Sequence, residues 1–224
     1  MRIRLGELRR IIRESIDVGK DLAVAVEEAP RGFKATVYDP VVFEDLVLDS
    51  PDVLIAPPGA LKNCVIGRVQ VIKPLDPCWD AMSVASIAGP GKLMYGVAYA
   101  LSPTGLLISD RDSMTDDAVS AWRRMAVKST RNRKKLDDIF APQTPEPEDD
   151  CILRTDEFLN YAYESEGWEM ETLNSLKSEH ERLVKRLTTG ADVSREAIER
   201  CLLTGGLAYF QKQYNAALKR QKRR

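Results

Sequence analysis

Short apolar runs separated by turn residues characterise the first third of the chain and predict β-strands. Two of these runs, 22–27 and 33–38, flank the break Ala29-Pro30-Arg31-Gly32, which predicts a hairpin. The run 64–72 is apolar on both sides, as expected for a strand that is covered on both faces. Residues 41–48 are apolar and acidic, and they fit either a strand or one helical segment.

The most informative stretch lies in the middle of the chain. Residues 82–88 are small and apolar, 92–101 carry apolar residues at helical spacing, and 106–109 form a second short apolar run. A second amphipathic helix is expected from about Thr115. A strand, a helix and another strand predict a βαβ unit with parallel strands. We therefore expect an α/β fold in which antiparallel strands precede this unit.

A glycine turn, Gly89-Pro90-Gly91, connects the first strand of this unit to its helix. The helix would then begin at the C-terminal end of the strand, where free N–H groups and the helix dipole favour an anion. Glycine also lets a phosphate approach the backbone closely. A tight turn without a ligand gives the same pattern, so the motif alone leaves both interpretations open.

This region resembles the GNAT-type N-acyltransferase family. That family carries Arg/Gln-x-x-Gly-x-Gly/Ala between its fourth strand and third helix, and the matching run here is 86–91. The helix after its next strand carries Asn-x-x-Ala-x-x-x-Tyr, and the matching run here is 115–122. The resemblance covers at most 22–140 and is specific only over 78–126. It implies a GNAT-like mixed sheet with acetyl-CoA or another acyl-CoA bound through the backbone. The residues of this predicted cradle are Ile87, Ala88, Gly89, Gly91, Lys92 and Leu93.

Three positions depart from the family pattern. Ser86 stands in place of Arg or Gln, Thr115 in place of Asn, and Trp122 in place of a tyrosine that protonates the departing thiolate. An indole N–H only donates a hydrogen bond and cannot act as a general acid near neutral pH. Trp122 is therefore expected to pack in the core. Two functions stay open: an N-acyltransferase with an unknown acceptor amine, or a catalytically inactive GNAT-like scaffold. The opening residues are similar to the start of several phage-encoded proteins, so the scaffold could be a phage structural or accessory protein.

Asp110 follows the second strand of the unit, at the edge where ligands collect in open α/β sheets. In an acyltransferase it would be a candidate general base or a group that orients the amine. Helix capping and turn formation explain the neighbouring Asp112, Ser113 and Thr115 equally well.

The 224 residues are 44% hydrophobic and 30% charged, with a formal net charge of −1, which excludes a strongly basic protein. Charge is nevertheless uneven. The basic segment 128–135 fits a solvated surface, the 3′-phosphate of coenzyme A or a nucleic-acid backbone. The basic tail fits a solvated helix end or a contact with nucleic acid or another acidic partner. Its residues are Lys219, Arg220, Lys222, Arg223 and Arg224.

Histidine and cysteine usage limits the chemistry. His180 is the single histidine and sits on an apolar helical stripe, so we expect it to be packed rather than catalytic. The four cysteines, Cys64, Cys78, Cys151 and Cys201, are scattered without C-x-x-C spacing, which argues against a metal site. Scattered cysteines and no signal-peptide pattern are typical of a cytoplasmic protein, or of a virion protein if phage-encoded. No apolar run has the ~20 residues of a membrane span.

The composition changes sharply at 142–150, an acidic and proline-rich segment that reads as a linker. We therefore predict an N-terminal amphipathic helix over 1–20, a GNAT-like domain over 21–141, and a helical extension with the basic tail over 151–224. A short helix over 156–165 is followed by stronger helices, the longest of which ends at Gly190. The extension could bind a protein partner or a second copy of the chain.

Overall fold

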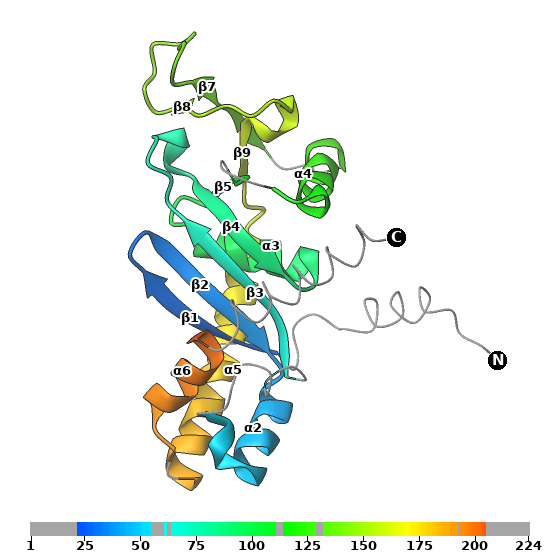
Figure 1. Ribbon diagram of the computed structural model, residues 1–224, viewed down its shortest axis with the longest axis vertical. Helices are drawn as coiled ribbons and strands as arrows, with labels where there is room; N and C mark the ends of the chain where they lie inside the picture. Colours follow the sequence, from blue (N-terminus) through cyan, green and yellow to red (C-terminus); the bar gives the residue numbers. More distant parts are fainter. Residues whose placement is uncertain are drawn as a thin grey trace, which may run out of the picture.

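The structure, a computed structural model, describes residues 22–54, 61, 64–110, 114–128, 132–191 and 193–204. It is a mixed α/β fold built on a mostly antiparallel seven-stranded sheet in the order β1-β2-β3-β4-β5-β9-β6 (Figure 1). The strands of this sheet are β1 (Ala23–Ala29), β2 (Gly32–Tyr38), β3 (Val65–Ile72), β4 (Met82–Ala88), β5 (Leu106–Ile108), β6 (Arg133–Lys135) and β9 (Tyr161–Glu164). The α-helices among the described residues are α2 (Pro40–Asp49), α3 (Gly91–Leu101), α4 (Asp116–Lys128), α5 (Trp168–Gly190) and α6 (Arg195–Thr204).

The antiparallel part of the sheet confirms the predicted hairpin. β1 pairs with β2, β2 with β3, and β3 with β4, all antiparallel. Residues 41–48, for which two structures were open, form most of α2. That helix begins where it does because the carboxylate of Asp39 accepts hydrogen bonds from the N–H groups of Val41 and Val42. Pro40 fills the first turn, where its missing N–H costs nothing.

The predicted βαβ unit is also confirmed. β4 continues through α3 into β5, and the two strands are parallel. Their pairing is short, since only Met82 with Leu107 and Ser83 with Ile108 are matched. Residues 84–88 carry β4 on past the end of β5 (Figure 1). At the point where the strands part, the hydroxyl of Ser83 donates to the carbonyl of Ser109 at 3.2 Å.

The chain that follows the acidic segment returns to the sheet. β9 lies between β5 and β6 and pairs antiparallel with both. The predicted helix over 156–165 is therefore wrong, apart from the single 3₁₀ turn η4 (Glu157–Leu159). The strand is stabilised because successive side chains point to opposite faces of the sheet and both faces are covered. Ala162 and Tyr163 are buried in two different apolar clusters. Helices α5 and α6 confirm the helical pattern beyond this strand, and α5 ends at Gly190 as predicted.

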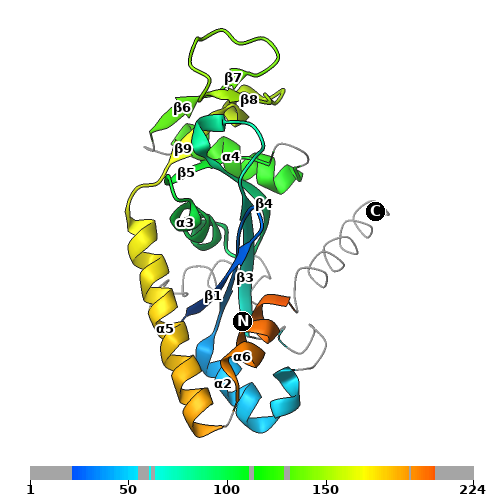
Figure 2. The ribbon, with the colours of Figure 1, turned by 90° about the vertical axis from the view of Figure 1, so that its left-hand side faces the viewer.

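The long helix α5 connects two apolar cores. Figure 2 shows α3 and α5 on one face of the sheet and α6 on the other. Leu173 and Leu176 of α5 pack with α3 in the larger cluster. About two turns further on, Leu183 and Leu187 pack with α2, α6 and β1 in a second cluster. The 23 residues of this helix thus tie the antiparallel strands to the βαβ unit.

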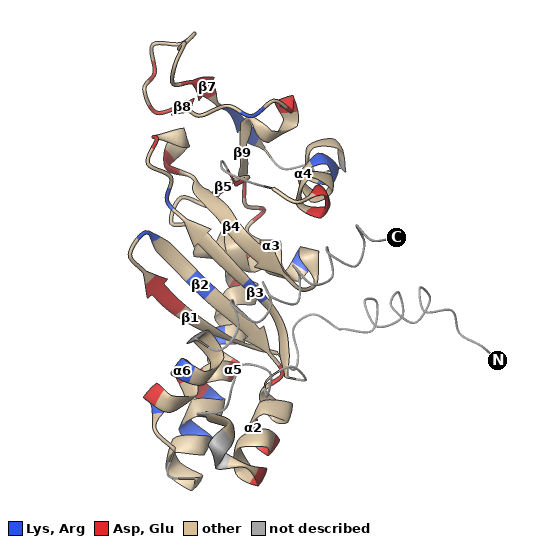
Figure 3. Cartoon of the chain, viewed as in Figure 1, with Lys and Arg blue, Asp and Glu red and all other residues tan. Residues whose placement is uncertain are grey.

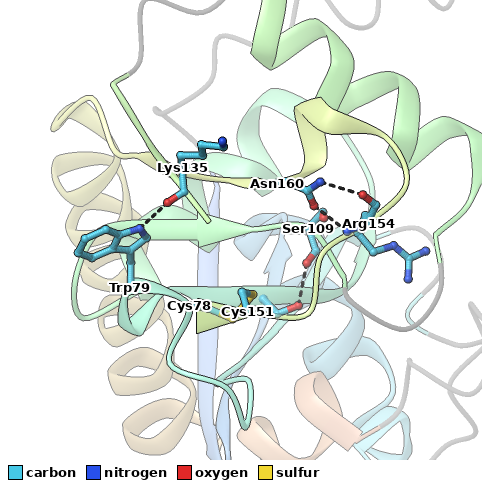
Figure 4. Close-up of a disulfide and its surroundings, with 8 residues drawn as sticks. Cys78, Trp79, Ser109, Lys135, Cys151, Arg154 and Asn160 are labelled. Carbon is cyan, nitrogen blue, oxygen red and sulfur yellow. Dashed lines mark hydrogen bonds between the residues drawn. A yellow bond between two sulfur atoms is a disulfide. The ribbon is translucent and has the colours of Figure 1, made fainter. Parts of the chain in front are cut away.

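A disulfide bond joins Cys78 to Cys151 (Figure 4). Cys78 begins the 3₁₀ turn η3 (Cys78–Asp80) before β4, and Cys151 ends the two-residue strand β8 (Asp150–Cys151). β8 pairs in parallel with β7 (Asp137–Asp138), so the bond also holds the loop between them. The scatter of the cysteines gave no sign of this pair. Because disulfides are typical of oxidising compartments, cysteine usage no longer supports the predicted cytoplasmic location. Cys64 and Cys201 are buried free thiols.

Two predicted segments lie outside the described residues. They are the amphipathic helix over 1–20 and the basic tail with Lys219, Arg220, Lys222, Arg223 and Arg224. Within the described ranges, no helix has the length and apolar character required to cross a membrane.

Candidate cofactor site at the start of helix α3

The turn between β4 and α3 is shaped by Gly89. Its φ of +113° is a conformation that residues with a side chain rarely adopt. A Cβ at this position would lie 2.7 Å from the Cα of Gly67 and 2.8 Å from the carbonyl oxygen of Ile66. The turn therefore passes directly against β3, and packing alone explains this first glycine of the motif.

Gly91 has no such packing reason. A Cβ placed there would meet nothing within 4 Å, and both Gly91 and Lys92 are exposed. Pro90 occupies the N-cap without a side-chain hydrogen bond to the helix, and the first turn holds no acidic residue. The first intrahelical bond of this turn runs from the N–H of Met94 to the carbonyl of Pro90 at 3.0 Å. The N–H groups before Met94 belong to the unsatisfied first turn of a helix, where an anion is favoured.

The other predicted cradle residues divide into two groups. Ile87 and Ala88 lie within the β3–β4 pairing, opposite Val69 and Arg68. Leu93 turns its side chain into the core, with 2% exposed, so only its backbone faces the turn. Lys92 places its ammonium 5.7 Å from the ring centroid of Trp168, at the start of α5. The open part of the cradle therefore consists of residues 91–93.

β4 carries an irregularity just before the cradle. Its register with β3 shifts between the pairs Gln70–Ser86 and Val71–Val84, which leaves Ala85 as an extra residue. Such a bulge disrupts the local ladder and is frequent beside binding sites. The hydroxyl of Ser86 is buried without a hydrogen-bond partner among the described groups. A buried, unsatisfied hydroxyl is costly, so this position favours a ligand or water as its partner.

Asp110 lies on the same side of the parallel pair as the cradle, but at a different depth. Residues 84–88 extend β4 by about 17 Å past its last pair with β5, whereas Asp110 is within about 7 Å of chain from Ile108. Asp110 and the cradle thus differ by about 10 Å along the strand direction. The carboxylate is half-buried, near the point where the strands part. Asp112 and Ser113, for which capping or turn formation is predicted, lie outside the described residues. Thr115 accepts a hydrogen bond from the N–H of Ala118, as predicted for a cap.

Trp122 packs in the core, as predicted, and is 1% exposed. Its ring meets Tyr95 of α3 edge-on, with centroids 5.6 Å apart, and Tyr163 of β9 at 5.5 Å. The phenol of Tyr163 donates to the carbonyl of Phe158 at 2.7 Å. Burial raises the pKa of Tyr95 to about 12, so this phenol stays protonated at neutral pH. Sequence reasoning did not single out Tyr95, although its position four residues after Gly91 places it one helical turn beyond the cradle.

His180 is packed, as its apolar stripe predicted. Its Nδ1 and the hydroxyl of Tyr38 are hydrogen bonded at 2.7 Å, and the histidine is 6% exposed. Burial lowers the pKa of this imidazole, with smaller effects from neighbouring charges. The pair links α5 to β2 inside the second apolar cluster, so we assign it a structural role.

A group of carboxylates holds the loop between β7 and β8. Oxygens of Asp137, Asp149 and Asp150 lie within 4.8 Å of one another. Asp137 accepts hydrogen bonds from the N–H groups of Gln143 and Thr144, and the Thr144 hydroxyl bonds both Asp137 and Asp149. Burial and the neighbouring Asp149 and Asp137 raise the pKa of Asp150. These hydrogen bonds account for Asp137 and Asp149 as anchors of the acidic loop. Oδ1 of Asp150 is buried without a hydrogen-bond partner among the described groups.

Comparisons with family models, with curated proteins and with solved structures found no significant match. Function is therefore inferred from the geometry of the βαβ unit.

Proposed function

We propose that the chain is a GNAT-like N-acyltransferase that uses acetyl-CoA or another acyl-CoA. The observation that carries the proposal is the open start of α3, where Gly91 is exposed and unconstrained at the end of a bulged strand. Among the described strands β4 is the fourth, and α3 leads from it to the parallel fifth strand β5, an order that agrees with the resemblance. A helix follows that fifth strand and carries Trp122 at the position compared with the family tyrosine.

Each group of residues has a role in this proposal. The N–H groups of Gly91, Lys92 and Leu93 bind the diphosphate through hydrogen bonds and the helix dipole. Bound acyl-CoA supplies the thioester whose acyl carbon an amine attacks. Asp110, near the parting of the strands, orients the amine or accepts its proton through water. The phenol of Tyr95, whose ring contacts Trp122, is the candidate donor of a proton to the leaving sulfur.

The second candidate function is an inactive GNAT-like scaffold, for example a phage structural or accessory protein. Trp122 favours it, because its buried indole fills the aromatic cluster and offers no acid. Pro90 favours it as well, since a proline removes one N–H donor from the cradle. In this case the protein acts by binding a protein partner or a second copy of itself, in the cytoplasm or in a virion.

Calorimetric titration with acetyl-CoA separates the two functions, using Gly91→Glu and its neutral isostere Gly91→Gln as a matched pair. Because a side chain at Gly91 meets no neighbouring atom within 4 Å at its Cβ, both variants are expected to fold with unchanged thermal midpoints. We expect micromolar binding by the wild type, loss in Gly91→Glu, and a smaller loss in Gly91→Gln. Binding followed by thiol release with an amine acceptor supports the enzyme. If the wild type does not bind acetyl-CoA, the acyltransferase proposal is contradicted and the inactive scaffold is the function that remains.

A further inference from the structure

Three cations near the edge strand β6 lie over aromatic rings. The guanidinium of Arg133 is 4.4 Å from the ring centroid of Tyr161, and the ammonium of Lys134 is 4.9 Å from that of Trp79. A third pair places the guanidinium of Arg123, on α4, 5.2 Å from the ring of Phe158. Contact with a ring face attracts a cation and limits its motion, so these charges are partly ordered before any partner binds.

The cations of these pairs, together with Lys135, form a surface that we call the basic edge; its residues are Arg123, Arg133, Lys134 and Lys135. β6 is the last strand of the sheet, and all three of its residues are exposed. Figure 3 shows this strand in blue beside β9. Successive side chains of a strand point to opposite faces, so Arg133 and Lys135 share one face and Lys134 lies on the other. Arg123 joins from α4, which packs against η4 beside this strand.

The basic edge carries uncompensated charge. None of its four cations forms an ion pair with a carboxylate of the described chain. By contrast, the arginines of α5 and α6 are mostly paired, for example Arg186 with Glu44 and Arg195 with Glu181. Unpaired cations next to one another repel, and a polyanion relieves that repulsion while releasing its own counterions.

We infer that the basic edge binds the phosphate backbone of a single-stranded nucleic acid. Arg133 and Lys135 are about 7 Å apart along the strand, a repeat that suits neighbouring phosphates of an extended chain. Lys134, on the opposite face of β6, contacts the phosphate backbone of the nucleic acid from the other side of the basic edge. The half-buried rings of Tyr161, Phe158 and Trp79 each lie under one of the cations. Such a combination of charge and aromatic surface is typical of single-strand binding.

An acidic polypeptide fits this surface less well. A peptide that joins a sheet edge gains its affinity from a ladder of main-chain hydrogen bonds. β6 is only three residues long, and the carbonyl of Lys135 already accepts a hydrogen bond from the indole of Trp79 at 2.8 Å (Figure 4). Short, charged edge strands are also those that resist the addition of another strand. The basic edge therefore presents charges and aromatic surface, but few free main-chain groups with which a peptide could form hydrogen bonds.

The test is fluorescence anisotropy with a labelled oligothymidylate of about 15 nucleotides, measured over a range of salt concentrations. The edge variant combines Arg133→Gln, Lys134→Gln and Lys135→Gln. Its matched control combines Lys177→Gln, Arg182→Gln and Lys185→Gln on the exposed face of α5, with the same change in net charge. Because each phosphate contact contributes about 0.7 to the salt slope for single strands, the edge variant should lose about 2 units of slope. The control should keep the slope of the wild type.

Three results would overturn the inference. The wild type fails to bind the oligonucleotide, the edge variant and the control lose affinity equally, or polyglutamate of the same charge competes as well as unlabelled oligothymidylate. The last result would assign the surface to an acidic polypeptide. Tyr161→Leu gives a further readout, since loss of the ring should weaken binding several-fold while the salt slope stays unchanged. None of these measurements depends on coenzyme A, so they test nucleic-acid binding independently of the proposed acyltransferase activity.

Discussion

Breaking the disulfide between Cys78 and Cys151 should produce the largest loss of stability that reduction can cause in this fold. The bond joins residues 73 positions apart in the sequence. In the chain-entropy description, closing a loop of that length restricts the unfolded chain by about 4.4 kcal/mol at 25 °C. It also fixes β8, and with it the loop between β7 and β8, against the turn that precedes β4.

Urea unfolding followed by tryptophan fluorescence measures the effect. With a slope of about 2–3 kcal/mol per molar urea, a loss of about 4 kcal/mol lowers the urea midpoint by about 1.5–2 M. The comparison uses the oxidised protein, the same protein with reductant, and the double variant Cys78→Ser with Cys151→Ser. Reductant should lower the midpoint of the wild type to that of the double variant and leave the double variant unchanged. If the oxidised and the reduced wild type have the same urea midpoint, the disulfide contributes nothing to the free energy of unfolding and the prediction is wrong.

Three further predictions concern the site and the core. Gly89→Ala should destabilise the fold by more than about 1 kcal/mol, because the φ of Gly89 is +113° and an added Cβ would meet the backbone of β3. Gly91→Ala should be neutral or stabilise the fold by about 0.5 kcal/mol, and thermal unfolding of both variants checks this. Trp122→Ala should cost about 3–5 kcal/mol in urea unfolding, since it empties a fully buried aromatic site; a smaller cost than 1 kcal/mol contradicts the packing. Burial lowers the pKa of His180, so the stability that the neutral imidazole contributes is present above about pH 6.5 and is lost as the pH falls below that value. Between pH 7 and pH 5, the free energy of unfolding should therefore fall less in His180→Gln than in the wild type.

The local parts of the fold could be predicted from the sequence. The hairpin, β4, α3 and β5 follow from periodicity and turn residues that lie within a few positions of each other. The same local signals were not sufficient for β9. Its strand is only four residues long, and its place between β5 and β6 is decided by partners far away in the sequence. Without those partners, 156–165 had the composition of a short helix.

The candidate site shows the same division. The glycine turn and the packing of Trp122 could be read from spacing along single helices. Tyr95 and Tyr163, which contact Trp122, come from two other elements, so their proximity depends on the tertiary fold. The disulfide is missed for the same reason, because Cys78 and Cys151 are distant in sequence and meet only when β8 folds back onto η3. The basic segment was visible, but its aromatic neighbours Trp79 and Tyr161 were not.

We propose that the first turn of α3 binds the diphosphate of an acyl-CoA. Backbone amide chemical shifts in an ¹⁵N-labelled sample, followed during titration with acetyl-CoA, test it at the atoms concerned. We predict the largest shifts at the amides of Gly91, Lys92 and Leu93, with smaller shifts near Asp110. Saturating acetyl-CoA that leaves these amides unchanged, or shifts only residues on other elements, would contradict it.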